Sequence, residues 1–145
     1  MAEKGLGRAM DAAELEAFMG REFPQVAADF AVERLTPEGV VVRLKVAERH
    51  LRPGGTVSGP NIFALADVAI YLATLARIGP KALTVTTSAS IDFMRKPAAD
   101  ADLIGEARLL KLGRVLVVGD VLIRSDGSDA VVARASVTYS IPPAG

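Results

Sequence analysis

Apolar residues cover nearly every side of one long central segment, whereas most of the chain after it alternates apolar and polar positions. Residues 60–78 combine large apolar side chains with interspersed alanines, and few polar side chains interrupt them. A helix of this composition is surrounded by protein, because an exposed helix carries a polar face. The pattern therefore predicts a buried helix of about five turns. Pro60 suits its first turn, and Gly79-Pro80 would end it.

Alternation with a period of two follows this helix and predicts antiparallel strands. The expected strands are residues 84–94, 103–112, 114–124 and 131–141, and residues 30–35 and 40–46 predict a hairpin before the helix. Short turns join the later strands, which requires antiparallel neighbours. In the strand 84–94, Thr86 and Ser88 are expected on one face, and Ala89 and Ile91 on the other. The Ser and Thr face is expected to meet solvent or a partner subunit.

The N-terminal residues predict a short amphipathic helix. Asp11 and Glu14 have the spacing of a capping box, and Leu15, Phe18 and Met19 follow on one helical face. The first 19 residues carry charges and no continuous apolar run, so they do not resemble a signal peptide and a cytoplasmic location is expected. The elements predict one α+β domain over residues 1–145, with an N-terminal helical segment in 1–25. An antiparallel sheet of five or six strands would wrap around the central helix.

Composition narrows the possible functions. Seventeen Lys and Arg residues balance seventeen Asp and Glu residues, so no excess positive charge indicates nucleic-acid binding. With no cysteine and one histidine, neither a cysteine nucleophile nor a metal site is expected. That histidine, His50, is interpreted as an ordinary loop residue with no predicted partner. Residues 60–78 approach the length of a membrane span, but Asn61 and Asp67 interrupt them, and no membrane association is expected.

Two features at the central helix are candidates for chemistry. Asp67 is the only acidic residue between Glu48 and Asp92. An ionised carboxylate in apolar surroundings must be paired, hydrogen-bonded, protonated or placed in a cleft, and such groups often mark functional sites. The alternative is a structural role, in which Asp67 only accepts hydrogen bonds. At the helix start, the Gly59 N–H and the helix dipole could attract a carbonyl oxygen or an anion, although ordinary capping explains the same motif.

These segments resemble a known family. The matching residues are 52–69, Thr84-Val85-Thr86, 92–97 and Leu112-Gly113-Arg114. They are similar to the PaaI-like hotdog-fold acyl-CoA thioesterases, and the resemblance extends over residues 40–141. That family has a His-Gly-Gly helix start with an aspartate nine positions after the histidine. Here the corresponding residues are Ser58, Gly59, Pro60 and Asp67.

The resemblance implies a hotdog fold, assembly as a homodimer or homotetramer, and hydrolysis of an acyl-CoA thioester to a free acid and coenzyme A. Coenzyme A belongs to the substrate, and no cofactor is implied. Asp67 would act as general base or nucleophile, Gly59 would bind the carbonyl oxygen, and Ser58 and Thr86 would position the water. The implied substrate-binding residues are Arg52, Asn61, Arg95, Lys96 and Arg114. Arg52 occupies a position where the family often has asparagine, and the last three would contact phosphates.

A second class of function stays open. Ser58 replaces the family histidine and Pro60 replaces the second glycine. A hotdog protein with these changes could bind an acyl-CoA or another acyl ligand without cleaving it. A dehydratase is less favoured, because similar dehydratases use a histidine that this sequence does not place beside Asp67.

Overall fold

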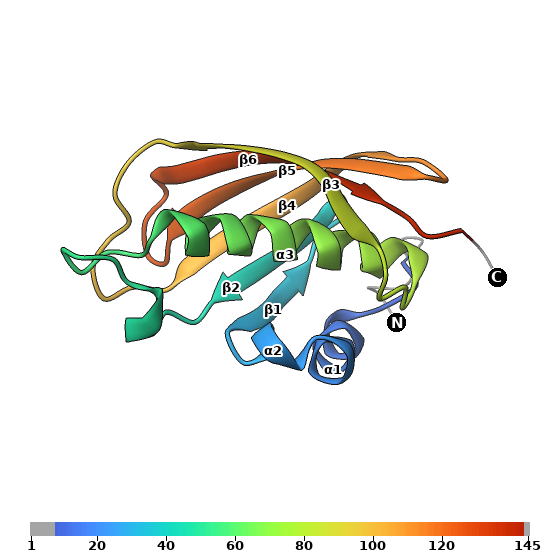
Figure 1. The fold of residues 1–145 in the computed structure, drawn as a ribbon, viewed down its shortest axis with the longest axis horizontal. Helices are drawn as coiled ribbons and strands as arrows, with labels where there is room; N and C mark the ends of the chain where they lie inside the picture. The colour runs from blue at the N-terminus through green and yellow to red at the C-terminus, as the bar shows by residue number, and fades with distance from the viewer. Residues whose placement is uncertain (1–7, 144–145) are drawn as a thin grey trace.

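A six-stranded antiparallel sheet curves around one long helix, α3, in the computed structural model, which describes residues 8–143 (Figure 1). The strand order is β1-β2-β4-β5-β6-β3. The helices are α1 (Ala12–Glu22), α2 (Pro24–Ala27) and α3 (Gly59–Ile78), and a short 3-10 turn, η2, covers Glu48–His50. The strands are β1 (Phe30–Leu35), β2 (Gly39–Leu44), β3 (Val85–Phe93), β4 (Leu103–Leu112), β5 (Leu116–Ser125) and β6 (Val131–Ser140). This architecture confirms the predicted α+β hotdog fold.

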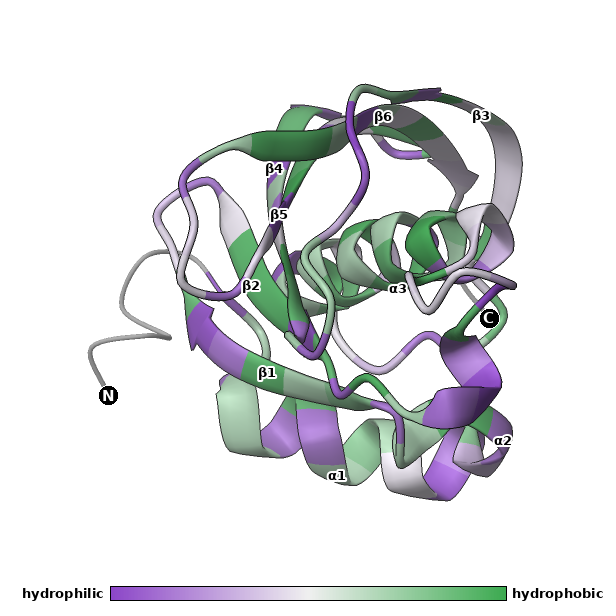
Figure 2. Cartoon of the chain, turned by 90° about the vertical axis from the view of Figure 1, so that its left-hand side faces the viewer, coloured by the Kyte–Doolittle hydropathy of each residue, from purple (hydrophilic) through white to green (hydrophobic). Residues whose placement is uncertain are grey.

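Close packing between α3 and the sheet explains the apolar character of the helix on nearly all sides. Figure 2 looks nearly along α3 and shows the sheet curving around it. Leu65 and Ile70 are fully buried, and glycines on the facing strands make room for them. A Cβ atom at Gly105 would lie 3.2 Å from Leu65 Cγ, and one at Gly119 would lie 2.6 Å from Ile70 Cδ1. The helix has the length and composition of a membrane span, but most of it is buried inside the protein.

The N-terminal helix forms as predicted. Asp11 Oδ1 accepts a hydrogen bond from the Glu14 N–H (2.9 Å), and the Asp11 N–H donates to Glu14 Oε1 (3.0 Å), which completes the capping box. Leu15, Phe18 and Met19 are buried, and the helix packs beside β1. Residues 1–7 of the expected helical segment 1–25 lie outside the described residues.

Strand β3 forms one edge of the sheet and contains a bulge that corrects the predicted alternation. Thr86 pairs with Tyr139, whereas Ser88 pairs with Thr138, so the register shifts at Thr87. Thr86 and Ala89 therefore lie on the side of the sheet that faces α3, and the expectation that Thr86 shares a face with Ser88 is wrong. A regular alternation cannot reveal an extra residue, because the bulge is set by pairing with β6. The free edge of β3 exposes backbone groups that could pair with another strand.

Most predicted boundaries hold to within two residues. Among the strands, two boundaries shift by two residues: β2 ends at Leu44 and not at Val46, and β5 begins at Leu116 and not at Arg114. The Gly113 N–H donates to the Leu116 carbonyl oxygen (2.9 Å), and this turn keeps Arg114 out of the strand.

Candidate active site

Asp67 lies half-buried on α3 and faces strands β3 and β6. Its Oδ1 accepts hydrogen bonds from Thr86 Oγ1 (2.6 Å) and from the Tyr139 hydroxyl (2.8 Å). The Tyr139 hydroxyl is also 3.0 Å from the Asp67 carbonyl oxygen. Oδ2 receives no hydrogen bond from the residues that the structure describes. One carboxylate oxygen is thus fixed by two hydroxyl groups, and the other is available to a ligand or a water molecule.

Tyr139 is the member of this group that the sequence analysis missed. Its ring is buried and lies 5.9 Å from the ring of Tyr71, centroid to centroid. Burial, and then the charge of the Asp67 carboxylate, raise the pKa of the Tyr139 phenol. The phenol therefore keeps its proton at neutral pH and donates a hydrogen bond to the Asp67 carboxylate. The sequence signal that could have found Tyr139 is its inward-facing position on the last strand. A buried tyrosine hydroxyl usually requires a hydrogen-bond partner.

Replacing Tyr139 with phenylalanine tests this hydrogen bond. Within residues 8–143, Tyr139→Phe keeps the ring but leaves Thr86 as the sole hydroxyl donor to Asp67 Oδ1. A hydrogen bond to a charged group contributes about 1.5–3 kcal/mol, so we expect turnover to fall by about tenfold or more. Thiol release from an acyl-CoA measures the effect. Thr74→Val is the control, because the Thr74 hydroxyl is buried on α3 and donates to the Ile70 carbonyl oxygen (2.8 Å) and not to Asp67; an equal loss in both variants would contradict the role of Tyr139.

An open cleft of about 390 Å³ lies beside Asp67. Three aromatic side chains line it, those of Phe23, Tyr71 and Tyr139, and the first two pack edge to face with centroids 6.3 Å apart. Gln25 and Thr84 add polar groups to the lining. Residues from the α1–α2 junction thus meet α3 and β3 at one cleft, and its apolar and aromatic walls suit an acyl group.

The start of α3 is held by contacts within the chain. Ser58 is the helix N-cap, and its Oγ accepts from the Asn61 side-chain amide (2.8 Å) and the Asn61 N–H (3.4 Å). The Asn61 amide also donates to the His50 carbonyl oxygen (3.3 Å). Both amide donors of Asn61 therefore bind the protein itself. Ser58 likewise acts as a cap at the helix start and lies apart from Asp67.

A second cleft, of about 410 Å³, opens at this helix start. Gly59 lines it, together with three of the predicted cationic residues, Arg52, Arg95 and Lys96. The N–H of Gly59 belongs to the first helical turn, whose donors have no acceptor within the helix. The ring of Phe93, which is 54% exposed, is 3.4 Å from the position of a Cβ atom at Gly59. This cleft therefore combines a backbone donor, an aromatic ring and positive charge.

Arg114 is not part of this cleft. It lies in the turn between β4 and β5, next to Val115, whose carbonyl oxygen accepts from the Ile141 N–H at the end of β6 (2.7 Å). The Arg95 N–H instead donates to the Val132 carbonyl oxygen near the beginning of β6 (3.2 Å). Within one chain, Arg114 is therefore separated from Arg95 and Lys96 by the length of β6.

Asp67 and Gly59 line different clefts. They are eight residues apart on α3, which corresponds to about 12 Å along the helix axis. A rigid helix cannot bring them to one reacting carbonyl group. The sequence predicted both residues, but within one chain the structure does not place them together.

His50 differs from the expected loop histidine without a partner. It is buried, its Nδ1 accepts from the Ala47 N–H (2.8 Å), and its Nε2 lies 3.2 Å from Asp29 Oδ2. The Nε2–Asp29 contact is close but poorly aligned for a hydrogen bond. The partner was missed because Asp29 is far away in the sequence.

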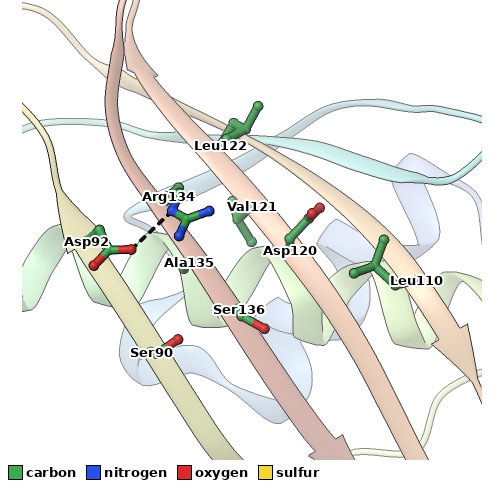
Figure 3. Close-up of a pocket in the computed structure, with 9 residues that line it drawn as sticks. All are labelled: Ser90, Asp92, Leu110, Asp120, Val121, Leu122, Arg134, Ala135 and Ser136. Carbon is green, nitrogen blue, oxygen red and sulfur yellow. Dashed lines mark hydrogen bonds and ion pairs between the residues drawn. The ribbon is translucent and has the colours of Figure 1, made fainter.

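A third depression, of about 210 Å³, lies on the outer face of the sheet (Figure 3). An ion pair between Arg134 Nε and Asp92 Oδ2 (3.0 Å) crosses from β6 to β3 there, and Leu110 and Leu122 stand nearby. It contains none of the predicted catalytic residues. In residues 8–143, no group of three or more His, Asp or Glu side chains could hold a metal ion.

The curved sheet around a carboxylate-bearing helix defines a hotdog protein. Residues 54–132, more than half of the chain, match the Thioesterase superfamily, and the chain belongs to this family. A provisionally assigned thioesterase from Silicibacter sp. TM1040 is 54% identical, with 97% of each chain covered and a TM-score of 0.89. The phenylacetic acid degradation protein PaaI from Thermus thermophilus is 32% identical, with 82% of this chain and 99% of that chain covered and a TM-score of 0.69. No functionally curated protein matches the sequence significantly.

Proposed function

We propose that the protein hydrolyses acyl-CoA thioesters to a free acid and coenzyme A, in sites formed between two copies of the chain. The Asp67 carboxylate carries this proposal. One of its oxygens is fixed by Thr86 and Tyr139, and the other is available beside a cleft on the central helix of a thioesterase-superfamily fold.

In the proposed reaction, Asp67 acts as a general base. Oδ2 takes a proton from a water molecule, and the water oxygen attacks the thioester carbon to form a tetrahedral oxyanion. The carbon–sulfur bond then breaks, and the coenzyme A thiolate receives the proton from the Asp67 carboxyl group. The two hydroxyl groups on Oδ1 keep the carboxylate oriented, which preserves the short water contact that proton transfer requires.

The oxyanion needs a donor that Asp67's own chain cannot provide from Gly59, because about 12 Å of helix separates them. A second copy of the chain can provide this donor if the two chains pair along their β3 edge strands. Two β3 strands that pair antiparallel about Ser90, with the bulge at Thr87 retained, would set Thr86 opposite the partner's Phe93. Since Thr86 contacts Asp67 and Phe93 lies over Gly59, this pairing brings Asp67 to Gly59 of the partner subunit. A dimer, or a dimer of dimers, then has one such site for each chain.

Coenzyme A would occupy the cleft at the helix start, where Arg52, Arg95 and Lys96 offer charge-assisted contacts to its phosphates. Replacing Arg95 and Lys96 together with alanine is expected to weaken binding by about tenfold. Calorimetry with a non-hydrolysable acyl-CoA analogue measures the dissociation constant. Binding of the parent protein should also weaken as salt increases, because salt screens exposed charges.

Arg114→Ala provides the control for this binding experiment. Arg114 is exposed and lies outside the cleft, so its replacement should change the dissociation constant little. A loss at Arg114 equal to that of the Arg95 and Lys96 variant would show that general surface charge, and not this cleft, binds the phosphates.

Thiol release from short-chain, long-chain and aryl acyl-CoA substrates tests the function as a whole. Hydrolysis of at least one substrate is the expected result. The alternative is a protein that binds acyl-CoA without cleaving it, which Ser58 and Pro60 at the helix start favour. Tight binding without thiol release would establish that alternative, and neither binding nor release would exclude both.

A further inference from the structure

We infer that Asp29 and His50 are positioning residues that hold the coenzyme A cleft in shape, an inference that rests on the proposed function. Neither residue lines that cleft. Both act on residues 51–57, the loop that leads from η2 to the start of α3 and provides Arg52 to the cleft wall.

The histidine is fixed by its own ring contacts. Nδ1 accepts the Ala47 N–H, so in the neutral ring the proton lies on Nε2. That nitrogen is buried and lies 3.2 Å from Asp29 Oδ2. A buried N–H beside a carboxylate is attracted to it even where the alignment is imperfect. The ring thus connects η2 to the residue just before β1.

Asp29 is itself anchored to the sheet. Its carbonyl oxygen accepts from the Lys45 N–H directly after β2 (2.8 Å). Its carboxylate contacts His50 and the exposed Arg49. Burial alone would raise the pKa of Asp29, but the contacts with His50 and Arg49 outweigh it and keep that pKa below its ordinary value. The carboxylate is therefore ionised at neutral pH and opposite the buried ring.

The backbone of His50 carries the connection to the cleft. Its carbonyl oxygen accepts from the Ser58 N–H (2.9 Å) and from the Asn61 side chain (3.3 Å), so it fixes both ends of the turn into α3. The loop is closed by a bridge between Leu51 and Val57 and by a bond from the Arg52 N–H to the Thr56 carbonyl oxygen (2.8 Å). A displaced His50 would therefore move Arg52 and the helix start together.

Asp29→Ala tests the inference with two independent readouts. The first is hydrogen exchange at the Ser58 amide, which we expect to become faster because its acceptor is less firmly held. The second is calorimetry, in which we expect coenzyme A to bind about tenfold more weakly, since displacements of about 1 Å at a binding site have effects of this size or larger. Turnover at saturating substrate should change less than the KM, because Asp67 and its two hydroxyl donors are untouched.

Arg49→Ala is the matched control, because it removes the exposed partner of Asp29 but leaves His50 in place. It should leave both readouts near those of the parent protein. Two His50 variants each keep one of the two contacts of the imidazole ring. They replace Asp29→Ala in the test if that variant does not fold. His50→Gln keeps a donor for Asp29, and His50→Asn keeps an acceptor for the Ala47 N–H. We expect His50→Gln to retain tighter coenzyme A binding than His50→Asn.

The outcomes separate this inference from the proposed function. If the parent protein binds coenzyme A but Asp29→Ala leaves exchange and binding unchanged, the inference is overturned and the proposed function stands. Faster exchange with unchanged binding also overturns it. If the parent protein does not bind coenzyme A, the proposed function fails, and unchanged Ser58 exchange in Asp29→Ala would show that the anchoring is absent as well.

Discussion

Asp67→Asn is expected to lower the rate of thioester hydrolysis by at least about 100-fold while the protein still folds and binds coenzyme A. General base catalysis by a positioned side chain contributes about 10²–10⁴-fold, and an amide cannot take the proton from water. The substitution keeps the size of the side chain and an oxygen that can accept from Thr86 and Tyr139. Thiol release measures turnover, and thermal unfolding and size-exclusion chromatography establish that fold and assembly are retained.

Asp92→Asn is the matched control for this experiment. Asp92 is an exposed carboxylate on β3 that pairs with Arg134 on the outer face of the sheet. Exposed pairs contribute little, so the control should hydrolyse its substrate at close to the parent rate. If a folded, correctly assembled Asp67→Asn variant did the same, Asp67 would be a structural acceptor of hydrogen bonds and the catalytic proposal would fail.

Much of the fold could be predicted because local signals and tertiary packing agree. The helix at residues 60–78 lacks a polar face, and the sheet buries it from several strands. The turns between the later strands are short, so the strands had to be antiparallel. Asp67 could be singled out from the sequence because a carboxylate on an otherwise apolar helix must be paired, hydrogen-bonded, protonated or placed in a cleft.

The hydrogen-bond partners of Asp67 and the carboxylate partner of His50 could not be predicted from the sequence in the way that the fold could. Tyr139 is 72 residues from Asp67, and it meets the carboxylate only because β6 crosses this part of α3. Thr86 points toward α3 because of the bulge at Thr87, which depends on the pairing of β3 with β6. Both contacts follow from long-range register, which hydrophobic alternation leaves unspecified.

The separation of Gly59 from Asp67 shows a different limit. Both residues were candidates for one site, and helical spacing alone already separates them by about 12 Å. A site that uses both residues therefore has to involve two chains. The exposed edge of β3 is the surface at which a second chain can pair, and the position of Phe93 over Gly59 sets which residues would meet.

Mixed dimers are expected to recover activity that neither parent homodimer has. We consider Asp67→Asn in one chain and Gly59→Val in the other, where the valine side chain would meet the Phe93 ring and block access to the Gly59 N–H. Removing one oxyanion donor costs about 10²–10³ in rate, so each homodimer should be nearly inactive. Co-expression with two affinity tags and purification on both isolates the mixed dimer. If Asp67 works with Gly59 of the partner subunit, one of its two sites is intact, and about half of the parent activity returns.

A second mixed dimer, with both substitutions in one chain, distinguishes sites shared between chains from sites contained within one chain. A chain that carries both Asp67→Asn and Gly59→Val is combined with an unmodified chain and purified in the same way. If the sites are shared between chains, each of the two sites in this dimer contains one altered residue, and we expect almost no hydrolysis. If each chain instead held a complete site of its own, this dimer would keep about half of the parent activity and the first mixed dimer would have none. The two architectures therefore predict opposite results from the same four protein chains, and recovery in the second dimer but not the first would overturn the shared site.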